Sequence, residues 1–353
     1  MREKKQSTNL APPQTAHAVA GFRRHLLAHY RSHGRSLPWR ERTDAYGIWL
    51  SEIMLQQTTV ATVIPYYQKF LKAFPTVFDL AAAPLDDVLT LWQGLGYYSR
   101  GRNLHKCAQV IVREHNGQFP QTAKELEKLP GIGPYTSAAI AAMAFGEAAT
   151  VVDGNVLRIC SRLFCDSSPI PSDKASLTIH AQTLTDPDSA GDYANAIMDL
   201  GATICKPNPK CDVCPVSRYC LAYQRGVVAD YPKKTPKKQR PHKTGEAYVL
   251  FDKDGRVYLR RRPDTGLLAK LWEVPHKHWE ERPLHPKEQS YIDQTTLTHC
   301  GEIKHVFTHF SLTLQVKCGQ LDEVKESWVE AADIQNHALP TLMKKVLAKA
   351  ESS

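Results

Sequence analysis

The chain has 353 residues and a formal net charge of +9, with 45 Lys and Arg against 36 Asp and Glu. Its hydrophobic content of 42% is ordinary for a globular protein. It contains no run of about eighteen apolar residues, so we expect no membrane-spanning helix. The length allows two or three domains, and the positive charge suits a polyanionic partner without identifying one.

Residues 1–17 are polar, include two prolines and lack the apolar segment of a secretion signal. This composition predicts a disordered N-terminal tail and a protein that is not secreted. The nine cysteines are therefore expected in a reducing compartment, where metal ligation is favoured over disulfide formation.

A first candidate catalytic residue, Glu52, lies in an apolar stretch that reads as helical. Apolar side chains share one helical face between residues 44 and 70, namely Trp49, Ile53, Val60 and Ile64. Glu52 and Gln56 are four residues apart on an adjacent edge. An apolar setting would raise the pKa of Glu52 and suit it to general-acid work. The alternative is a solvated glutamate on the outside of an amphipathic helix.

Residues 91–102 combine glycine with aromatic and basic side chains. Gly94, Gly96 and Gly101 predict a loop, and Tyr97 and Arg100 are of the types that contact an unstacked nucleotide and its phosphates. A well-packed connection without a DNA contact is the alternative.

Residues 126–145 predict a helix–hairpin–helix. Pro130 and Gly131 stop a first helix, Gly133 is expected to allow a tight turn, and Thr136–Phe145 reads as a helix of small residues. A glycine hairpin before a helix N-terminus presents backbone N–H groups that suit a DNA phosphate. An ordinary turn between helices is the alternative.

A second candidate carboxylate, Asp153, stands after a short apolar run and before a predicted helix over Val156–Leu163. A carboxylate at a helix N-terminus is stabilised in its ionised form. Asn155 is close enough in sequence to orient it. The sequence thus places Asp153 where it stays charged and Glu52 where it stays protonated, which is the pattern of an acid/base pair. A plain N-cap role for Asp153 is the alternative.

Four cysteines within sixteen residues form a strong metal-binding pattern: Cys205, Cys211, Cys214 and Cys220. Four thiolates suit zinc or a [4Fe–4S] cluster. Zinc sites usually pair two Cys-x2-Cys clips, whereas this loop has one clip flanked by single cysteines, which favours the cluster. The remaining cysteines lack ligand spacing and are interpreted as ordinary thiols: Cys107, Cys160, Cys165, Cys300 and Cys318.

Residues 230–243 carry three prolines and no acid after Asp230, and predict an extended basic linker. Beyond it, Glu246–Asp252 and Arg256–Arg261 predict a hairpin, Val306–Lys317 a strand and Leu339–Ala350 a helix, which together make a small α+β domain. The triplet Phe307, Thr308 and His309 is expected at the start of the late strand. Either Phe307 belongs to the core and His309 to the surface, or the triplet forms a loop tip that recognises a DNA base.

Taken together, these motifs resemble the MutY-type adenine DNA glycosylases of the endonuclease III superfamily. The resemblance runs from about residue 20 to about residue 345. Its most specific elements are WLSEIMLQQT (49–58), WQGLGYY (92–98), LPGIG (129–133), VDGNV (152–156) and the cysteine loop. It implies an all-α helix–hairpin–helix glycosylase domain (18–229) with an iron–sulfur loop (205–220), followed by an α+β Nudix-like domain (244–348).

The resemblance also implies roles for individual residues. Glu52 matches the family's acid, Asp153 its essential aspartate and Asn155 the residue that orients that aspartate. Tyr135 stands where bifunctional relatives carry a nucleophilic lysine, which implies a monofunctional glycosylase. Further residues are expected to contact DNA, with the last three reading the lesion: Gln56, Gln57, Tyr97, Arg100, Gly131, Gly133, Phe307, Thr308 and His309.

The implied substrate is duplex DNA with adenine opposite 8-oxoguanine or guanine, and the implied cofactor is one [4Fe–4S] cluster held by the four cysteines. We expect a monomer that is cytoplasmic and nucleoid-associated if the source is bacterial. The first cysteine spacer, Lys206–Lys210, has five residues where the family usually has six, so the loop is either tighter or the cluster altered. The Nudix-like part of the sequence lacks an Arg-Glu-x-x-Glu-Glu box, so we expect no pyrophosphohydrolase activity there.

Two other functions stay open at this point. One is a superfamily glycosylase for a different mismatched or damaged base, against which the Phe-Thr-His triplet argues. The other is a non-catalytic iron–sulfur DNA-binding protein, which would need neither Glu52 nor Asp153.

Overall fold

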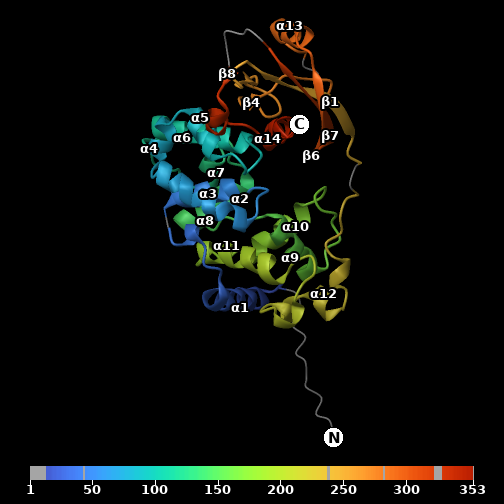
Figure 1. Cartoon of the computed structure of the whole chain (residues 1–353). Helices are drawn as coiled ribbons and strands as arrows, with labels where there is room; N and C mark the ends of the chain where they lie inside the picture. The colour runs from blue at the N-terminus through green and yellow to red at the C-terminus, as the bar shows by residue number, and fades with distance from the viewer. Residues whose placement is uncertain (1–12, 43, 237–238, 281–282, 322–327, 353) are drawn as a thin grey trace. The chain divides into compact units, whose positions relative to one another are not determined.

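The computed structural model describes residues 13–42, 44–236, 239–280, 283–321 and 328–352 (Figure 1). The chain divides into two compact units. The first comprises Met1–Phe78 and Lys106–Lys237, and the second Asp79–His105 and Lys238–Ser353. The segment Asp79–His105, which the sequence assigns to the helical domain, thus packs with the C-terminal part of the chain. We describe each unit by itself.

The first unit is helical. Its elements are α1 (Ala16–His33), η1 (Pro38–Arg40), α2 (Ala45–Leu55), α3 (Val60–Ala73), α7 (Ala123–Leu126), α8 (Pro134–Phe145), α9 (Gly154–Phe164), α10 (Ala175–Leu184), α11 (Ala190–Asp199), η2 (Leu200–Ile204), η3 (Cys211–Val213), η4 (Ser217–Tyr219), α12 (Leu221–Gln224) and η5 (Val228–Asp230). Two further helices, α4 (Val77–Ala82) and α6 (Ser99–His115), cross the boundary between the units.

Helix α1 begins earlier than the sequence predicts. The Thr15 hydroxyl caps it by accepting a hydrogen bond from the backbone N–H of Ala18 at 3.2 Å. The last two residues of the predicted tail, Ala16 and His17, are therefore helical, and residues 1–12 lie outside the described residues.

The helical stretch around Glu52 is broken in two, which corrects the single apolar face expected for residues 44–70. Helix α2 ends at Leu55, α3 starts at Val60, and Gln57 between them has a φ of +58°. Asp44 and Thr59 supply the two N-caps through their side chains. The break separates the Glu52 helix from α3.

The predicted hairpin lies between α7 and α8. Gly131 has a φ of +77°, where a β-carbon would strain the backbone, whereas Gly133 has an extended φ of −101°. The sequence interpretation of Gly133 as the tight-turn glycine is therefore wrong, and Gly131 has that role. Pro134 begins α8 at the position where helices tolerate proline.

The main core of the first unit brings together helices from both ends of its sequence. Phe22 and Leu26 of α1 are buried in one cluster with apolar side chains of α9, α10 and α11. Figure 1 shows α11 next to α1. The predicted helix after Asp153 is confirmed as α9, and Asp153 is its N-cap. Burial of these faces holds the start of α9, and with it Asp153, in a fixed place.

The second unit is built on a sheet with strand order β6-β7-β1-β2-β8, in which β5 pairs with β1 and β3 forms a separate pair with β4. Strands β1 and β7 are parallel, and β6 and β7 are antiparallel. The elements are α5 (Leu85–Leu91), β1 (His242–Phe251), β2 (Val257–Tyr258), β3 (Arg260–Arg261), β4 (Trp272–Glu273), β5 (His276–Lys277), α13 (Pro286–Gln294), β6 (Thr298–Val306), β7 (Ser311–Gln320), β8 (Trp328–Val329), η6 (Ala331–Asn336) and α14 (Thr341–Glu351).

Strand β1 begins at His242, inside the predicted linker, and residues 237–238 lie outside the described residues. The hairpin predicted between Glu246–Asp252 and Arg256–Arg261 is confirmed. Its strands β1 and β2 pair at Phe251 and Val257, and Gly255 in the turn has a φ of +79°. Helix α14 buries Leu342 and Val346 in the core beneath the sheet.

Two expectations for the second unit are wrong. Residues 306–317 do not form one strand, because Phe307–Phe310 is a turn that joins β6 to β7, closed by a hydrogen bond from the Phe307 N–H to the Phe310 carbonyl at 2.9 Å. Cys300 and Cys318, interpreted as ordinary thiols, are joined by a disulfide across β6 and β7, with their Cα atoms 6.3 Å apart. The pairing of β6 with β7 brings together these two cysteines, which are 18 residues apart in the sequence.

Within the described residues, no helix combines the length and the apolar character needed to cross a membrane.

Candidate active site

A cavity of about 400 Å³ in the first unit brings four of the sequence-predicted site residues together: Glu52, Tyr135, Asp153 and Asn155. They come from α2, α8 and the N-terminal end of α9. The volume falls in the range of about 300–1,000 Å³ typical of sites for small molecules. Gln56, which ends α2, donates from Nε2 to the Thr136 hydroxyl of α8 at 3.1 Å and so ties the two helices together beside the cavity.

Glu52 is 4% exposed, which rules out the surface alternative for this side chain. Its Oε2 atom is buried without a hydrogen-bond partner among the described residues. Burial is the largest influence on its pKa and raises it, and the negative charge of Asp153 acts in the same direction. The Tyr135 hydroxyl and the Arg40 charge lower it by less, and the resulting pKa is about 7. Glu52 can thus carry a proton near neutral pH.

Tyr135 projects from the first turn of α8 into the same cavity. Its hydroxyl donates to the Met198 sulfur of α11 at 3.1 Å. Burial, followed by the charges of Glu52 and Asp153, raises its pKa well above the usual range. Tyr135 therefore stays a neutral phenol and can serve as a hydrogen-bond donor.

Asp153 is held by three hydrogen bonds. Its Oδ1 accepts from the backbone N–H of Asn155 at 2.9 Å and of Val156 at 2.8 Å, and its Oδ2 accepts from Asn155 Nδ2 at 2.8 Å. These donors belong to the first turn of α9, where the helix dipole favours a negative charge. The carboxylate is thus fixed at the cavity wall.

Sequence reasoning missed Arg158, which orients Asn155 in turn. Arg158 Nη2 donates to Asn155 Oδ1 at 2.7 Å and to the Gly201 carbonyl at 2.9 Å, and its Nε donates to the Cys205 carbonyl at 2.7 Å. Gly201 is required beside Asn155, since a β-carbon there would come within 2.5 Å of Asn155 Cβ. A lone arginine three residues after Asn155 gives no signal for this role.

Sequence reasoning also missed an ion-paired group whose two arginines, Arg35 and Arg40, line the cavity. Asp199 of α11 accepts from Arg40 Nη1 and Nη2 at 2.8 and 2.7 Å and from Arg35 Nε at 2.7 Å, and Arg40 Nε donates to Asn195 Oδ1 at 3.1 Å. The two arginines hold the pKa of Asp199 below its usual value despite its burial. Arg40 is thereby fixed beside the cavity with its positive charge balanced.

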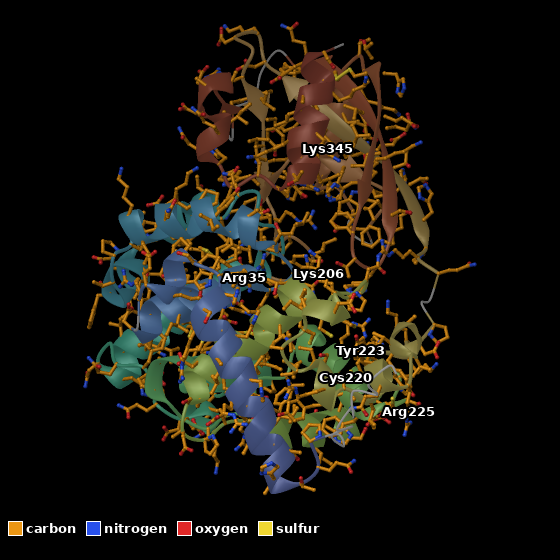
Figure 2. The ribbon with its side chains drawn as sticks, turned by 90° about the horizontal axis from the view of Figure 1, so that it is seen from below. Arg35, Lys206, Cys220, Tyr223, Arg225 and Lys345 are labelled. Carbon is orange, nitrogen blue, oxygen red and sulfur yellow. A yellow bond between two sulfur atoms is a disulfide. The ribbon has the colours of Figure 1, made fainter. Side chains whose placement is uncertain are left out.

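The four predicted metal ligands lie on the loop that follows η2, and Cys205, Cys214 and Cys220 pack against the main core of the unit. Figure 2 shows Cys220, Tyr223 and Arg225 close together. All four cysteines are free thiols. Burial raises the pKa of the Cys214 thiol to about 12 and that of the Cys220 thiol to about 11. Among the described residues, no group of three or more His, Cys, Asp or Glu side chains is placed so that it could hold a metal ion.

The short first spacer of this loop forms a closed turn. The backbone N–H groups of Lys206 and Lys210 both donate to the Ile204 carbonyl, at 2.9 and 3.0 Å. Arg162 binds the Lys206 carbonyl at 2.7 Å and approaches the Cys205 sulfur at 3.4 Å. The five-residue spacer is thus closed by hydrogen bonds to Ile204 and held by Arg162.

The other predicted DNA contacts of the first unit lie on its surface. Gln57 and Gly131 are exposed and Gly133 is half-buried. The positive φ of Gln57 turns the chain between α2 and α3. Their contacts with DNA stay predictions.

In the second unit, Tyr97 and Arg100 have different environments. Tyr97 is 47% exposed. Arg100 is 7% exposed, donates to the Leu95 carbonyl at 2.9 Å and packs against the Trp92 and Tyr97 rings at 5.3 and 5.6 Å. Desolvation lowers the pKa of Arg100 to about 10. In this structure Arg100 supports its own loop, and a direct contact with DNA stays a prediction.

The triplet Phe307, Thr308 and His309 forms most of the β6–β7 turn. Phe307 is half-buried, whereas Thr308 and His309 are exposed. The Tyr97 and Thr308 hydroxyls are hydrogen-bonded at 2.9 Å, and all four residues line a cavity of about 430 Å³ within the second unit. The triplet is thus at a loop tip beside an aromatic side chain.

Two protein families match parts of this chain. Residues 50–179 match the HhH-GPD superfamily of base excision DNA repair proteins, and residues 246–349 match the NUDIX domain. The second match covers the sheet unit, and the first covers the hairpin, Glu52 and Asp153.

Several curated relatives align along nearly the whole chain. The adenine DNA glycosylase of Rattus norvegicus is 37% identical over 401 residues, covering 93% of this chain and 77% of its own. That of Homo sapiens is 37% identical, with coverage of 93% and 73%. That of Buchnera aphidicola subsp. Baizongia pistaciae is 32% identical, with coverage of 93% and 96%.

Solved structures resemble the helical part of the chain. A thermostable thymine-DNA glycosylase is 31% identical at a TM-score of 0.54 and covers 59% of this chain and 97% of its own. An endonuclease III–DNA complex, at 20% identity and a TM-score of 0.51, covers 60% of this chain and 98% of its own and shows the fold alone. From these relatives, together with the helix–hairpin–helix and Nudix-like units, the chain belongs to the adenine DNA glycosylase family.

Proposed function

We propose that the chain removes adenine mispaired with 8-oxoguanine, or with guanine, from duplex DNA as a monofunctional glycosylase of base excision repair. One observation carries the proposal. A buried Glu52 with a pKa of about 7 lies in one cavity with Asp153, which is fixed at a helix N-terminus. Two carboxylates held in different environments are what acid-assisted cleavage of a glycosidic bond requires.

The proposed reaction begins with extrusion of the adenine from the duplex, which costs a few kcal/mol of unstacking. Protonated Glu52 donates to N7 of the base, which makes adenine a better leaving group as the bond from C1′ to N9 breaks. The Asp153 carboxylate stabilises the positive charge that develops on the sugar, by electrostatics or by a transient covalent bond.

After the base has left, Glu52 in its ionised form accepts a proton from water as that water attacks C1′. Asn155 keeps the Asp153 carboxylate in place, and Tyr135 offers a hydroxyl to the cavity. Tyr135 has no amine with which to form a Schiff base, so the product is an abasic site in an intact strand.

The cysteine loop is proposed to hold one [4Fe–4S] cluster through Cys205, Cys211, Cys214 and Cys220. The donor set suits such a cluster by its chemistry, since four free thiols follow one another on a single loop that Arg162 anchors. When bound, the cluster would fasten this loop to the core, and no step of base removal passes through it. Iron analysis of the purified chain should give about four atoms per molecule. Replacing Cys214 by Ser should lower that number, whereas Cys165→Ser, a cysteine outside the set, should not.

The partner is proposed to be duplex DNA, bound by a monomer. The hairpin at Gly131, the exposed Gln57 and the turn at Thr308 are the proposed contacts. A protein that acts on chromosomal DNA works where that DNA is kept, which in a bacterium is the cytoplasm.

Single-turnover cleavage of a duplex with adenine opposite 8-oxoguanine tests the proposal, with A·G, A·C and A·T duplexes as controls. Strand scission at the adenine only after alkali is the expected result. Scission without alkali would contradict the monofunctional assignment. Activity confined to a different base, measured on a T·G duplex in parallel, would favour another superfamily specificity, and no excision by iron-loaded protein would overturn the enzymatic assignment.

A further inference from the structure

The Phe307–Phe310 turn rests on a buried tryptophan. Trp279 is 1% exposed. Its ring lies 6.1 Å from that of Phe307, with the two planes 12° apart, and 6.3 Å from that of Phe310. The Phe307 and Phe310 rings are stacked at 4.6 Å. The position of the two phenylalanines, and hence of the exposed turn between them, depends on the Trp279 ring.

Trp279 is also held from other sides. The His276 ring lies 4.9 Å from it, and the Arg262 guanidinium lies 5.8 Å from its centroid. Lys243 Nζ donates to the Trp279 carbonyl at 3.2 Å and lies 4.9 Å from the Phe310 ring. A close-packed side chain with contacts of this kind cannot shift without disturbing its neighbours.

Next to Trp279 lies a set of hydrogen-bonded polar side chains that we name the ionic cluster: Arg262, Glu273, His276 and Glu280. Arg262 Nη2 donates to both Glu280 oxygens at 2.8 and 2.7 Å, and Arg262 Nη1 is paired with Glu273. His276 Nε2 is 3.0 Å from Glu273 Oε2. The side chains of Arg262, Glu273 and His276 are at most 4% exposed. Directional bonds between buried charges fix the position of each group.

Arg262 also contacts a second segment that lines the cavity beside the turn. Its Nε donates to the Leu267 carbonyl at 3.0 Å. Leu267 lines the same cavity of about 430 Å³ as Tyr97, Phe307 and Thr308. The ionic cluster therefore contacts both Trp279, which supports the turn, and the segment at Leu267.

We propose that Trp279, held by the ionic cluster, is a positioning residue that sets the Phe307–Phe310 turn for reading the base opposite the adenine. This inference rests on the proposed function. 8-Oxoguanine differs from guanine by an O8 carbonyl and an N7–H group, so discrimination depends on hydrogen-bonding groups placed within about 0.5 Å. A displaced turn loses that discrimination, while the groups proposed to cleave the adenine, Glu52 and Asp153, belong to the first unit.

The test compares Trp279→Leu with Trp279→Tyr in the full chain. The measured quantity is the ratio of single-turnover rate constants on A·8-oxoguanine and A·G duplexes. Trp279→Leu should lower this ratio about tenfold, equivalent to about 1.4 kcal/mol and the upper range for a lost aromatic pair. The A·G rate constant should stay unchanged. Trp279→Tyr keeps a flat ring and should retain most of the preference.

Trp328→Phe is the matched control, because Trp328 packs on Tyr258 at 5.9 Å in the same unit and does not line the cavity. Its ratio should equal that of the wild type. An unchanged ratio in Trp279→Leu, or an equal fall of both rate constants, would overturn the inference.

A second variant decides the matter if near-ultraviolet circular dichroism shows that Trp279→Leu unfolds. Glu280→Gln removes one charge at the partly exposed edge of the ionic cluster. Its ratio should fall about threefold, the effect of weakening a charged hydrogen bond, and an unchanged ratio overturns the inference. A wild-type chain that excises adenine from neither the A·8-oxoguanine nor the A·G duplex would overturn the proposed function itself. A wild-type preference that Trp279→Leu and Glu280→Gln retain overturns only the positioning role.

Discussion

Each unit of the molecule buries a glutamate, and the two side chains are in opposite electrostatic states. Glu52 in the first unit has one oxygen without a hydrogen-bond partner among the described residues, and its pKa rises to about 7. Glu273 in the second unit is 0% exposed, yet its pKa falls to about 2. Burial alone raises the pKa of both.

The difference lies in the neighbours. Next to Glu273, a hydrogen bond from His276 and the charges of His276, Arg262 and Arg260 outweigh the effect of burial. Next to Glu52, the strongest opposing influence is the hydroxyl of Tyr135, and the charge of Asp153 adds to the effect of burial. A buried carboxylate is thus a proton donor or a structural anion according to the cations it meets. We propose that Glu52 acts as a proton donor, whereas the neighbours of Glu273 hold it as an anion.

The largest expected effect comes from removing the anionic neighbour of Glu52. Asp153→Asn should keep DNA binding and lower the excision rate constant by about 10³-fold or more, since the charge on the sugar loses its counterion. Gel-shift titration and single-turnover cleavage measure the two properties. Cleavage at a near wild-type rate would remove Asp153 from the mechanism.

Glu52→Gln tests the proton donor itself. An amide cannot deliver a proton to adenine, so excision should slow by about 10²–10⁴-fold while DNA affinity is retained. Single-turnover cleavage provides the measurement. Glu125→Gln, at a glutamate near the hairpin outside the catalytic cavity, is a matched control that should keep the wild-type rate.

Glu273→Ala should mainly affect folding. It leaves Arg260 and Arg262 buried without this partner, at a cost of about 3–5 kcal/mol in the free energy of unfolding. Urea unfolding, followed by a signal from the second unit, measures the loss. Glu302→Ala, at an exposed position of β6, should change the same quantity by less than about 0.5 kcal/mol. Equal stability of the two variants would contradict a structural role for the ionic cluster.

Glu52→Gln should also have a pH-dependent effect on stability. Because the folded pKa of about 7 exceeds the ordinary value of 4.5, the proton on Glu52 favours folding fully below pH 4.5, and this contribution is lost as the pH rises to about 7. At pH 8 the variant should therefore be more stable than the wild type, by at most about 3 kcal/mol, with no such advantage at pH 4.5. Unfolding free energies at the two pH values provide the comparison, and a gap that does not change with pH would contradict the burial argument.

Local sequence patterns were enough to predict some of these features. The glycine hairpin, the capping position of Asp153 and the Lys253–Gly255 turn are set by backbone preferences of residues adjacent in the chain, and the structure contains each of them. Their prediction needs no knowledge of tertiary packing.

Other features depend on contacts between distant residues, and sequence spacing alone did not reveal them. The burial of Glu52 depends on packing of α2 with α8, and the Arg158–Asn155 contact on the placement of Gly201. The Cys300–Cys318 disulfide requires the pairing of β6 with β7, a strand boundary that the pattern around residue 306 did not show. The ionic cluster joins four side chains that no sequence motif groups together: Arg262, Glu273, His276 and Glu280.

The pH dependence of adenine excision tests the contrast between Glu52 and Glu273 most directly. The single-turnover rate constant of the wild type, measured from pH 5 to pH 9 on the A·8-oxoguanine duplex, should fall about tenfold per pH unit above about 7, as Glu52 loses its proton. The second unit should remain folded throughout, because Glu273 is ionised over this whole range. A rate constant that stays level between pH 6 and pH 9 would contradict the assignment of Glu52 as the proton donor.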